Sequence, residues 1–334
     1  MIKTLIVDDS SLVRTIIRDF LESDGAFEII GEAENGLEGV NQAVKLAPDL
    51  ITMDIEMPVM NGLEAIGEIK KSLSTSIVVI STHDTAKMAY DATVRGALEF
   101  FAKDVFTSQM SEQQRDKILN TLKQISGIKK RVPVPQKVIQ QTHVTVRKIK
   151  CVAIASSTGG PNALCQLLSA IPKDFPVPIM VVQHNMSGFD LGFVQWLDAC
   201  TQLNVCLAQK GTIPVKGNVY VAPTDKHFLT SDTGIVFDDG EPVNNQKPSA
   251  DLFFQSAAAL YRDSLVSVVL TGMGSDGAEG TRYVKQANGI TIAQDEATSM
   301  IYGMPLAAVE TGCVDMVLPL GSIAERLKSL VKEE

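Results

Sequence analysis

Short apolar segments alternate with amphipathic segments along almost the whole chain, and this alternation constrains the fold more than any other feature. The apolar segments are about five residues long and end in polar or glycine-containing turns, as expected of buried strands. The intervening segments carry apolar residues at helical spacing, such as Leu12, Ile16 and Phe20. Strands that alternate with helices predict an α/β fold with two doubly wound, mainly parallel sheets and right-handed crossovers.

The apolar pattern places the elements as follows. Strands are expected at 2–7, 28–33, 49–53, 77–81, 98–101, 151–155, 178–183, 204–208, 218–221, 234–237, 266–270, 290–293 and 314–317. Helices are expected at 11–23, 36–47, 62–71, 85–95, 105–124, 161–170, 189–200, 249–261, 277–287, 304–311 and 320–332. Residues 204–240 have no convincing helical pattern, so we expect an antiparallel hairpin there on the otherwise parallel sheet.

Charge divides the chain into three parts. Residues 1–124 carry 12 basic and 20 acidic side chains, residues 125–150 carry 7 basic and no acidic ones, and residues 151–334 carry 11 basic and 19 acidic ones. The middle part contains two prolines and has no sustained period, which is typical of a linker. We predict a domain at 1–124, a basic linker at 125–147 and a second domain at 148–334.

The composition argues against several classes of protein. A net charge of −9 disfavours binding to nucleic acid or to an anionic membrane surface. No apolar run approaches the roughly 18 residues that cross a bilayer, and Asp8-Asp9 interrupts any signal-peptide core, so we expect no membrane insertion. The five cysteines form no Cys-x-x-Cys motif and indicate reduced thiols in a cytoplasmic protein, for which a monomer is the default expectation.

Carboxylates follow two predicted strands of the N-terminal domain. Asp8 and Asp9 come directly after the first strand, and Asp54 comes after the third. The carboxyl ends of neighbouring parallel strands meet at a crevice where ligands bind. Three carboxylates crowded there favour a hard cation such as Mg²⁺, although each aspartate alone is equally compatible with a helix cap. Ser81 and Lys103 also end strands and are able to bind phosphoryl oxygens.

With its Asp54-x-x-Met-Pro-x-x-Asn-Gly motif, this constellation resembles the response-regulator receiver domain of two-component signalling. The resemblance implies Asp54 as phosphoacceptor; Asp8, Asp9, Asp54 and the Glu56 carbonyl as Mg²⁺ ligands; and Ser81, Phe100 and Lys103 as switch residues. Two positions depart from the family pattern. Asp104 follows Lys103 where proline is usual, and Asn61 stands where aspartate is commoner. Neither departure removes a chemical group from the predicted site.

A glycine-rich turn follows the buried strand 151–155. It reads Ser156-Ser157-Thr-Gly-Gly-Pro161, in which the glycines permit a sharp turn and the proline suits the first position of a helix. A side chain in such a turn lies beside free backbone N–H groups that are able to stabilise an oxyanion. The same turn is also common in ordinary helix starts, so it does not by itself predict catalysis.

His184 and Asp276 follow two other strands of the same predicted sheet. A serine hydroxyl needs a base to take its proton and a carboxylate to orient that base, and these three groups meet the requirement. His227 and His143 are competing histidines, one in a turn-rich stretch and one in the linker. The glycine-rich run 272–280 is an alternative phosphate cradle, but it lacks the order of a nucleotide-binding motif.

Residues 148–332 resemble the catalytic domain of the CheB family of chemotaxis protein-glutamate methylesterases. The matching motifs are Ser157-Thr-Gly-Gly-Pro, Val182-Gln-His, Tyr220-Val-Ala-Pro with His227 nearby, and Leu270-Thr-Gly-Met-Gly-Ser-Asp-Gly277. The resemblance implies Ser157 as nucleophile, His184 as general base and acid, Asp276 as the residue that orients His184, and oxyanion donors in the backbone near Thr158 and Met273. The adjacent Ser156 is the less favoured serine in this register.

The two resemblances together imply a phosphorylation-activated serine esterase. It would hydrolyse glutamate γ-methyl esters on chemoreceptor cytoplasmic domains, release methanol for sensory adaptation, and deamidate receptor glutamines. A CheA-type histidine kinase would be the phosphodonor, Mg²⁺ would bind in the receiver domain, and the esterase site would need no cofactor. We expect the unphosphorylated receiver to cover the edge that carries Ser157.

Two other classes of protein remain as alternatives. The first is a phosphorylation-dependent adaptor whose esterase-like domain is inactive; the presence of all three catalytic residue types argues against it. The second is a response regulator that binds DNA, which the acidic C-terminal domain disfavours because it contains no basic recognition helix.

Overall fold

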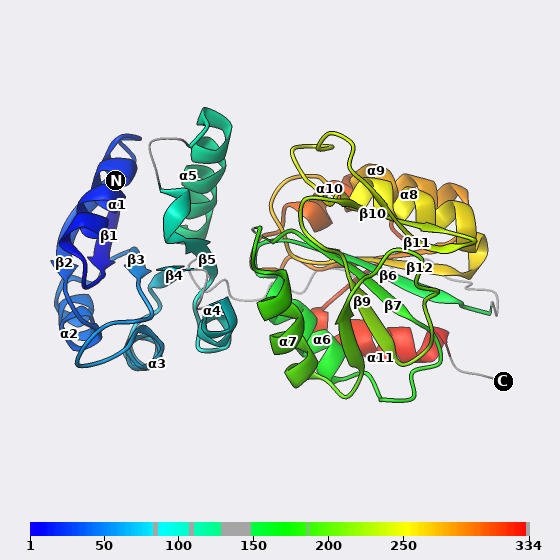
Figure 1. The fold of residues 1–334 in the computed structure, drawn as a ribbon, viewed down its shortest axis with the longest axis horizontal. Coiled ribbons are helices and arrows are strands. Elements are labelled where there is room, and N and C mark those ends of the chain that lie inside the picture. Colours follow the sequence, from blue (N-terminus) through cyan, green and yellow to red (C-terminus); the bar gives the residue numbers. More distant parts are fainter. Residues whose placement is uncertain (83–85, 107–109, 128–147, 186, 332–334) are drawn as a thin grey trace. The chain divides into compact units, whose positions relative to one another are not determined.

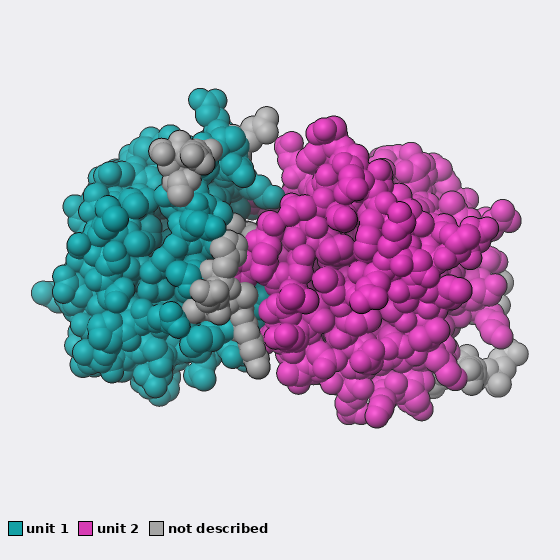
Figure 2. All heavy atoms as spheres, in the orientation of Figure 1, with its two compact units in different colours: residues 1–131 teal, residues 132–334 magenta. Residues whose placement is uncertain are grey.

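The computed structural model describes residues 1–82, 86–106, 110–127, 148–185 and 187–331. The chain forms two compact units, Met1–Arg131 and Val132–Glu334 (Figure 2). Residues 128–147 lie outside the described ranges, so the predicted linker at 125–147 and the domain limits stay predictions. Within those ranges, no helix combines the length and apolarity that a bilayer crossing requires.

The first unit is a five-stranded parallel sheet with the order β2-β1-β3-β4-β5. Helices α2, α3 and α4 lie on one face, and α1 and α5 lie on the other (Figure 1). The elements are β1 (Ile2–Val7), α1 (Ser11–Glu22), β2 (Phe27–Ala33), α2 (Gly36–Leu46), β3 (Leu50–Met53), α3 (Gly62–Ser72), β4 (Ser76–Ser81), α4 (Ala86–Val94), β5 (Glu99–Ala102), the 3₁₀ turn η2 (Lys103–Val105) and α5 (Glu112–Ser126). The central strands β3 and β4 are buried at every position, which explains their unbroken apolar runs.

The second unit is built on a seven-stranded sheet with the order β14-β13-β12-β6-β7-β9-β8, and every described pairing in it is parallel. Helices α6, α7 and α11 lie on one face, and α8, α9 and α10 lie on the other (Figure 1). The elements are β6 (Cys151–Ser156), α6 (Gly160–Ser169), β7 (Ile179–Gln183), α7 (Asp190–Cys200), β8 (Asn204–Leu207), β9 (Asn218–Val221), β10 (His227–Ser231), β11 (Gly234–Asp238), α8 (Ala250–Tyr261), the 3₁₀ turn η3 (Arg262–Ser264), β12 (Leu265–Val269), α9 (Ala278–Gln286), β13 (Ile290–Gln294), α10 (Met304–Glu310), β14 (Met316–Leu318) and α11 (Leu320–Leu330). The predicted α/β fold class is therefore confirmed.

Residues 204–240 differ in part from the prediction. β8 and β9 pair in parallel at the edge of the main sheet, whereas the antiparallel hairpin comprises β10 and β11 and forms a separate two-stranded sheet. β10 was not predicted. The expectation that the hairpin belongs to the main sheet is wrong because β10 packs against α8, and its edge does not pair with a strand of that sheet.

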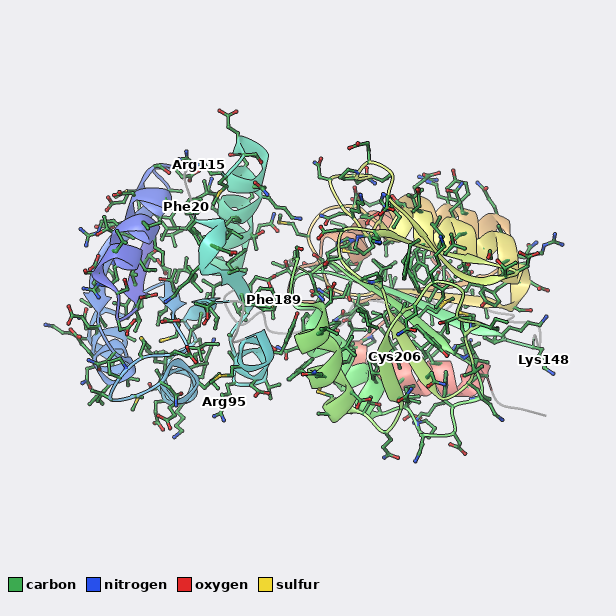
Figure 3. All side chains as sticks on the ribbon, viewed as in Figure 1. Phe20, Arg95, Arg115, Lys148, Phe189 and Cys206 are labelled. Atoms are coloured by element: carbon green, nitrogen blue, oxygen red, sulfur yellow. The ribbon has the colours of Figure 1, made fainter. Side chains whose placement is uncertain are left out.

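The start of α5 is also corrected. The helix was expected from residue 105, but Lys103–Val105 is a 3₁₀ turn and α5 begins at Glu112. Ser111 accepts the backbone N–H of Gln114, and the Gln114 side chain accepts the backbone N–H of Ser111, which makes a capping box. In the preceding segment, the ring of Phe106 packs edge-on against Phe20 of α1, with centroids 5.0 Å apart. Phe20 is labelled in Figure 3.

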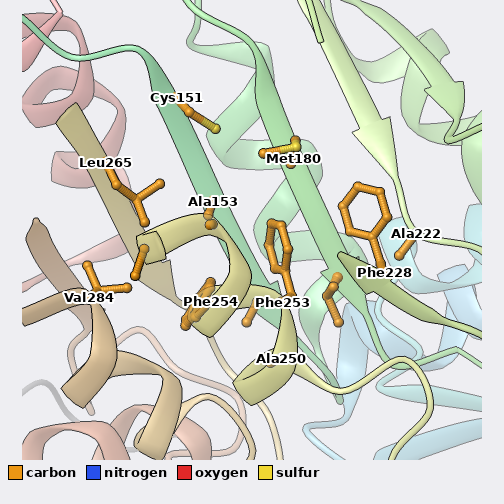
Figure 4. Packing of buried hydrophobic residues seen from close by; sticks show 14 of the residues in the cluster. Cys151, Ala153, Met180, Ala222, Phe228, Ala250, Phe253, Phe254, Leu265 and Val284 are labelled. Carbon is orange, nitrogen blue, oxygen red and sulfur yellow. The ribbon is translucent and has the colours of Figure 1, made fainter. Parts of the chain in front are cut away.

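The core of the second unit lies between the sheet and helices α8 to α10. Phe253 and Phe254 of α8 are fully buried against the strands β6 and β7 (Figure 4). Each such side chain stabilises the fold by about 1.5–3 kcal/mol through burial. This packing fixes α8, whose first turn points at the candidate site described next. All five cysteines are free.

Candidate active site

Ser157 and His184 follow neighbouring strands at the same edge of the sheet. Ser156 and Gln183 are register partners in β6 and β7, and the His184 N–H donates to the Ser156 carbonyl at 3.0 Å. Ser157 and His184 are therefore the next residues on two paired strands. On the other side of β6, the Ser157 N–H donates to the carbonyl of Thr271, which lies in the loop that leads to Asp276.

The structure distinguishes the two adjacent serines. Ser156 is fully buried, and its hydroxyl donates to Gln183 Oε1 at 2.6 Å. The Gln183 amide in turn donates to the carbonyls of Ser157 and His184 at 3.0 and 3.1 Å. Ser157 is partly exposed at the sheet edge. Gln183, which sequence reasoning did not single out, thus fixes the backbone on both sides of the candidate site.

His184 and Asp276 form a close pair. His184 Nε2 lies 2.9 Å from Asp276 Oδ2, and both side chains are about as buried as a core residue, at 5% and 3% exposure. His184 Nδ1 is buried and has no hydrogen-bond partner among the described residues. Because Nε2 faces the carboxylate, Nδ1 is the ring nitrogen available to a hydrogen-bond donor.

Asp276 lies against the first turn of α8. Its Oδ1 accepts hydrogen bonds from the Ser249 hydroxyl and the Asp251 N–H, and its Oδ2 accepts the Ala250 N–H at 2.7 Å. Burial by itself raises the pKa of Asp276, but the hydrogen bond and charge of His184, together with the N–H groups of α8, lower it overall. The carboxyl group is consequently held as an anion beside the imidazole.

Asp251 is a second buried carboxylate beside Asp276, and sequence reasoning missed it. Its Oδ1 accepts the N–H groups of Gly277 and Gly280 at 2.9 and 2.7 Å, so it caps α9 from α8. Burial raises the pKa of Asp251 to about 6, with a further contribution from the charge of Asp276. Ser249, with Asp251 two residues later, indicates the start of a helix in the sequence. That pattern does not reveal which loop the helix contacts.

The competing histidines are not part of this arrangement. His227 is fully buried, and both of its ring nitrogens have partners, the Ser249 N–H and the Glu241 carbonyl. His143 lies outside the described residues. Among the predicted oxyanion donors, Thr158 is buried in the turn after Ser157, and Met273 follows Gly272 on the neighbouring loop. Their role as donors stays a prediction.

A second cluster lies at the strand ends of the first unit. Lys103 Nζ contacts Asp54 Oδ2 at 2.7 Å and Asp8 Oδ2 at 2.8 Å. Burial and the charge of Asp8 raise the pKa of Asp54 against the lowering effect of Lys103. For Lys103, burial lowers the pKa, but the two carboxylates outweigh it and raise the pKa overall. This lysine therefore stays charged and screens the repulsion between the two aspartates.

The residues present suit a divalent cation. One carboxylate oxygen from each of Asp8, Asp9 and Asp54 lies within 4.8 Å of the others, and hard oxygen ligands are those that Mg²⁺ prefers. Asp8 and Asp54 are buried, whereas Asp9 is exposed. Glu56 lies in the turn two residues after Asp54 with its side chain exposed, which is compatible with a role for its carbonyl alone.

The predicted switch residues Ser81 and Phe100 lie on the paired strands β4 and β5. Ser81 ends β4 and is the register partner of Ala102, the residue before Lys103. Phe100 is buried on β5, and its ring packs edge-on against Tyr90 of α4 with centroids 4.8 Å apart. Asn61, one of the two departures from the family pattern, caps α3 by accepting the Glu64 N–H. The structure thus gives Asn61 a local role outside the carboxylate cluster.

Comparison with known proteins identifies the family of each unit. A family model described as CheB methylesterase matches residues 152–327, and one described as response regulator receiver domain matches residues 4–114. A protein-glutamate methylesterase/protein-glutamine glutaminase of Thermotoga maritima is 36% identical over 99% of both chains. One of Clostridium acetobutylicum is 37% identical over 99% of this chain and 98% of its own. The crystal structure of the Thermotoga maritima CheB methylesterase catalytic domain is 39% identical, with a TM-score of 0.53 over 55% of this chain and all of that one.

Fold and site together define a receiver domain joined to an α/β hydrolytic enzyme with a serine, a histidine and an aspartate at one sheet edge. More particularly, the chain belongs to the CheB methylesterase family. Both resemblances drawn from the sequence are thereby confirmed.

Proposed function

We propose that this protein is a phosphorylation-activated protein-glutamate methylesterase that acts on chemoreceptor cytoplasmic domains. The observation that carries the proposal is the buried His184–Asp276 pair at the strand end next to Ser157. The full-length relatives named protein-glutamate methylesterase/protein-glutamine glutaminase support the same substrate class. An inactive adaptor is not favoured, because the three groups that the chemistry needs are all present.

The reaction begins when Ser157 Oγ attacks the ester carbonyl carbon and His184 Nδ1 takes the hydroxyl proton. Asp276 stabilises the resulting imidazolium and holds its ring in place. The tetrahedral oxyanion is stabilised by backbone N–H groups near Thr158 and Met273. His184 then protonates the departing methoxide, which leaves as methanol. Water, activated by His184, hydrolyses the acyl-enzyme to a free glutamate and regenerates Ser157.

The same residues serve a second activity on receptor glutamines. An amide and an ester pass through the same type of tetrahedral intermediate, so deamidation requires only that His184 protonate the departing amide nitrogen, which leaves as ammonia, instead of methoxide. The relatives named as glutaminases support this extension. Neither reaction requires a metal at the esterase site in this mechanism.

Regulation is assigned to the first unit. Asp54 accepts a phosphoryl group from a CheA-type histidine kinase. Asp8, Asp9, Asp54 and the Glu56 carbonyl would hold Mg²⁺, which when bound would supply positive charge for the phosphoryl oxygens. Lys103, which already contacts Asp54, pairs with the phosphate. Ser81 donates its hydroxyl to it, and Phe100 moves in response. This change shifts the protein from a state in which the receiver covers the Ser157 edge towards an open state.

The test is methanol release from methylated receptor membranes, with and without acetyl phosphate and Mg²⁺. Release that increases with acetyl phosphate and is absent in Ser157→Ala is the expected result. A folded protein that becomes phosphorylated on Asp54 but releases no methanol under either condition would overturn the proposal and revive the adaptor alternative.

A further inference from the structure

A buried chain of hydrogen bonds continues behind Asp276 on the side away from His184. The Ser249 hydroxyl donates to Asp276 Oδ1 at 2.9 Å, and the Ser249 N–H donates to His227 Nδ1 at 3.2 Å. His227 Nε2 lies 2.9 Å from the Glu241 carbonyl. Ser249 and His227 are both 0% exposed. The chain thus runs from the Glu241 carbonyl through two fully buried residues to the carboxylate that contacts the imidazole of the candidate site.

The partners define the protonation of His227. The Ser249 N–H is a donor only, so Nδ1 must be an unprotonated acceptor. The Glu241 carbonyl is an acceptor only, so Nε2 must carry the proton and donate it. His227 is therefore the neutral Nε2–H tautomer, and the acceptor at Nδ1 is the group that fixes the Ser249 backbone.

The β10–β11 hairpin holds His227 firmly against α8. The ring of Phe228, the next residue on β10, lies 5.1 Å from that of Phe253 of α8 (Figure 4). Further along the same strand, the Thr230 N–H donates to the Ser256 hydroxyl at 3.1 Å. The apolar contact between Phe228 and Phe253 attaches the hairpin to α8 but does not fix the position of the helix N-cap. The His227 ring, whose two nitrogens are both hydrogen-bonded, fixes where the N-cap residue Ser249 lies.

From this arrangement we propose that His227 is a positioning residue for ester hydrolysis. Its Nδ1 holds the Ser249 N–H, and Ser249 in turn directs its hydroxyl to Asp276 Oδ1. With Oδ1 occupied, Oδ2 is aimed at His184 Nε2. The inference rests on the proposed esterase function, because it assigns His227 a part in orienting that reaction's base. His227 itself contacts none of the reacting atoms.

Two substitutions separate the positioning role from simple space filling. His227→Asn places an amide oxygen at the Nδ1 position and keeps an acceptor for Ser249. His227→Gln extends to the Nε2 position, keeps a donor for Glu241, and loses the acceptor. Both variants are made in the full-length protein, activated with acetyl phosphate and Mg²⁺, and compared per folded molecule, with the folded fraction taken from near-ultraviolet circular dichroism.

We expect His227→Gln to lower kcat roughly tenfold to a hundredfold with KM nearly unchanged, since small displacements of a catalytic group have costs of this size. His227→Asn should retain kcat within about threefold of the wild type by the same reasoning. Equal kcat values per folded molecule in the two variants, whether high or low, would overturn the inference.

A second readout does not depend on the substrate. The His184 ring proton that bonds to Asp276 gives a downfield signal in proton nuclear magnetic resonance, which should persist in His227→Asn and weaken or shift in His227→Gln. An unchanged signal in both variants contradicts the positioning role. A wild-type protein that shows the signal but releases no methanol contradicts the proposed function instead, so the two failures are distinguishable.

Discussion

At the scale of single residues, the contrast between Ser156 and Ser157 gives a direct test of the nucleophile. Ser157→Ala should lower methanol release by roughly 10⁴-fold or more, because the attacking oxygen is lost. Ser156→Ala should keep measurable turnover but lower the free energy of unfolding by about 1–3 kcal/mol, because Gln183 Oε1 loses its buried donor. The assay is methanol release alongside urea unfolding. A Ser156→Ala protein that is folded yet as inactive as Ser157→Ala would contradict the assignment.

Asp251 makes stability depend on pH. Its folded pKa of about 6 exceeds the value of about 3.9 in an unfolded chain, so between these values the folded state binds more protons. Its contribution to stability is therefore most favourable below about pH 4 and declines as pH rises to about 6. The lowered pKa of Asp276 makes stability change with pH in the opposite direction, but this change occurs at pH values below the usual pKa of a carboxyl group.

Asp251→Asn should remove this dependence. The melting temperature of the wild type minus that of the variant should fall from about pH 4 to about pH 6 and be constant above that range. Asp232→Asn, in an exposed turn, serves as the matched control with no such trend. A difference between wild type and Asp251→Asn that does not change with pH would show that the raised pKa is not present in the folded protein.

Sequence reasoning identified residues whose position follows from strand ends, and it missed those whose position follows from packing. Ser157, His184 and Asp276 each come after a strand of one sheet, so their common edge was predictable. Gln183, Ser249 and Asp251 support the site through contacts between segments distant in the chain. No local pattern specifies which loop a helix N-terminus will face, so these supporting roles needed the structure.

At the scale of elements, the start of α3 presses against the strand end that carries Asp54. A Cβ added to Gly62 would lie 1.9 Å from the Asp54 carbonyl oxygen, which is backbone and has little freedom to move. Gly62→Ala should therefore displace this turn, lower the free energy of unfolding by about 1–3 kcal/mol or more, and reduce phosphorylation of Asp54 by acetyl phosphate.

Gly67→Ala is the matched control in the same helix. An added Cβ there has only Arg95 nearby, at 3.9 Å, so the substitution should raise stability by up to about 1 kcal/mol through helix propensity. Urea unfolding and phosphate incorporation measure both variants. Equal behaviour of the two proteins would mean that the contact between Gly62 and Asp54 is not tight.

The errors in the predicted elements have physical causes. β10 reads His-Phe-Leu-Thr-Ser and pairs only with β11 among the described strands, so it lacks the apolar run of a central strand. The start of α5 was predictable from the capping box of Ser111 and Gln114, but the helix was predicted from residue 105, which is the last residue of the 3₁₀ turn Lys103–Val105. Buried central strands such as β4 and β6 were placed to within one residue.

At the scale of the whole molecule, both units place their chemistry at the same topological point. In the first sheet the order reverses between β1 and β3, whose ends carry Asp8, Asp9 and Asp54. In the second it reverses between β6 and β12, which lead to Ser157 and Asp276. Neighbouring strands whose connections leave in opposite directions create a crevice at their carboxyl ends. The two candidate sites thus lie at the equivalent position in their sheets, at the carboxyl ends of the two strands between which the order reverses.

Coupling between the units is testable through Asp54. If Asp54 is the phosphoacceptor, Asp54→Asn should lower the ratio of methanol release with and without acetyl phosphate to about one, whereas the wild type should show a clear increase. Both proteins are assayed on the same receptor membranes with Mg²⁺. Continued stimulation of the variant by acetyl phosphate would locate the activating group elsewhere in the protein.

The carboxylate of Asp276 satisfies the first N–H groups of α8 while it holds the imidazole of His184. Helix ends open locally far more often than whole domains unfold. Each opening of that first turn leaves Asp276 without the N–H groups that orient it toward His184, although nearly all of the secondary structure is intact. We therefore expect catalysis to weaken in mild heat or denaturant before spectroscopic unfolding begins, because activity depends on the order of one helical turn.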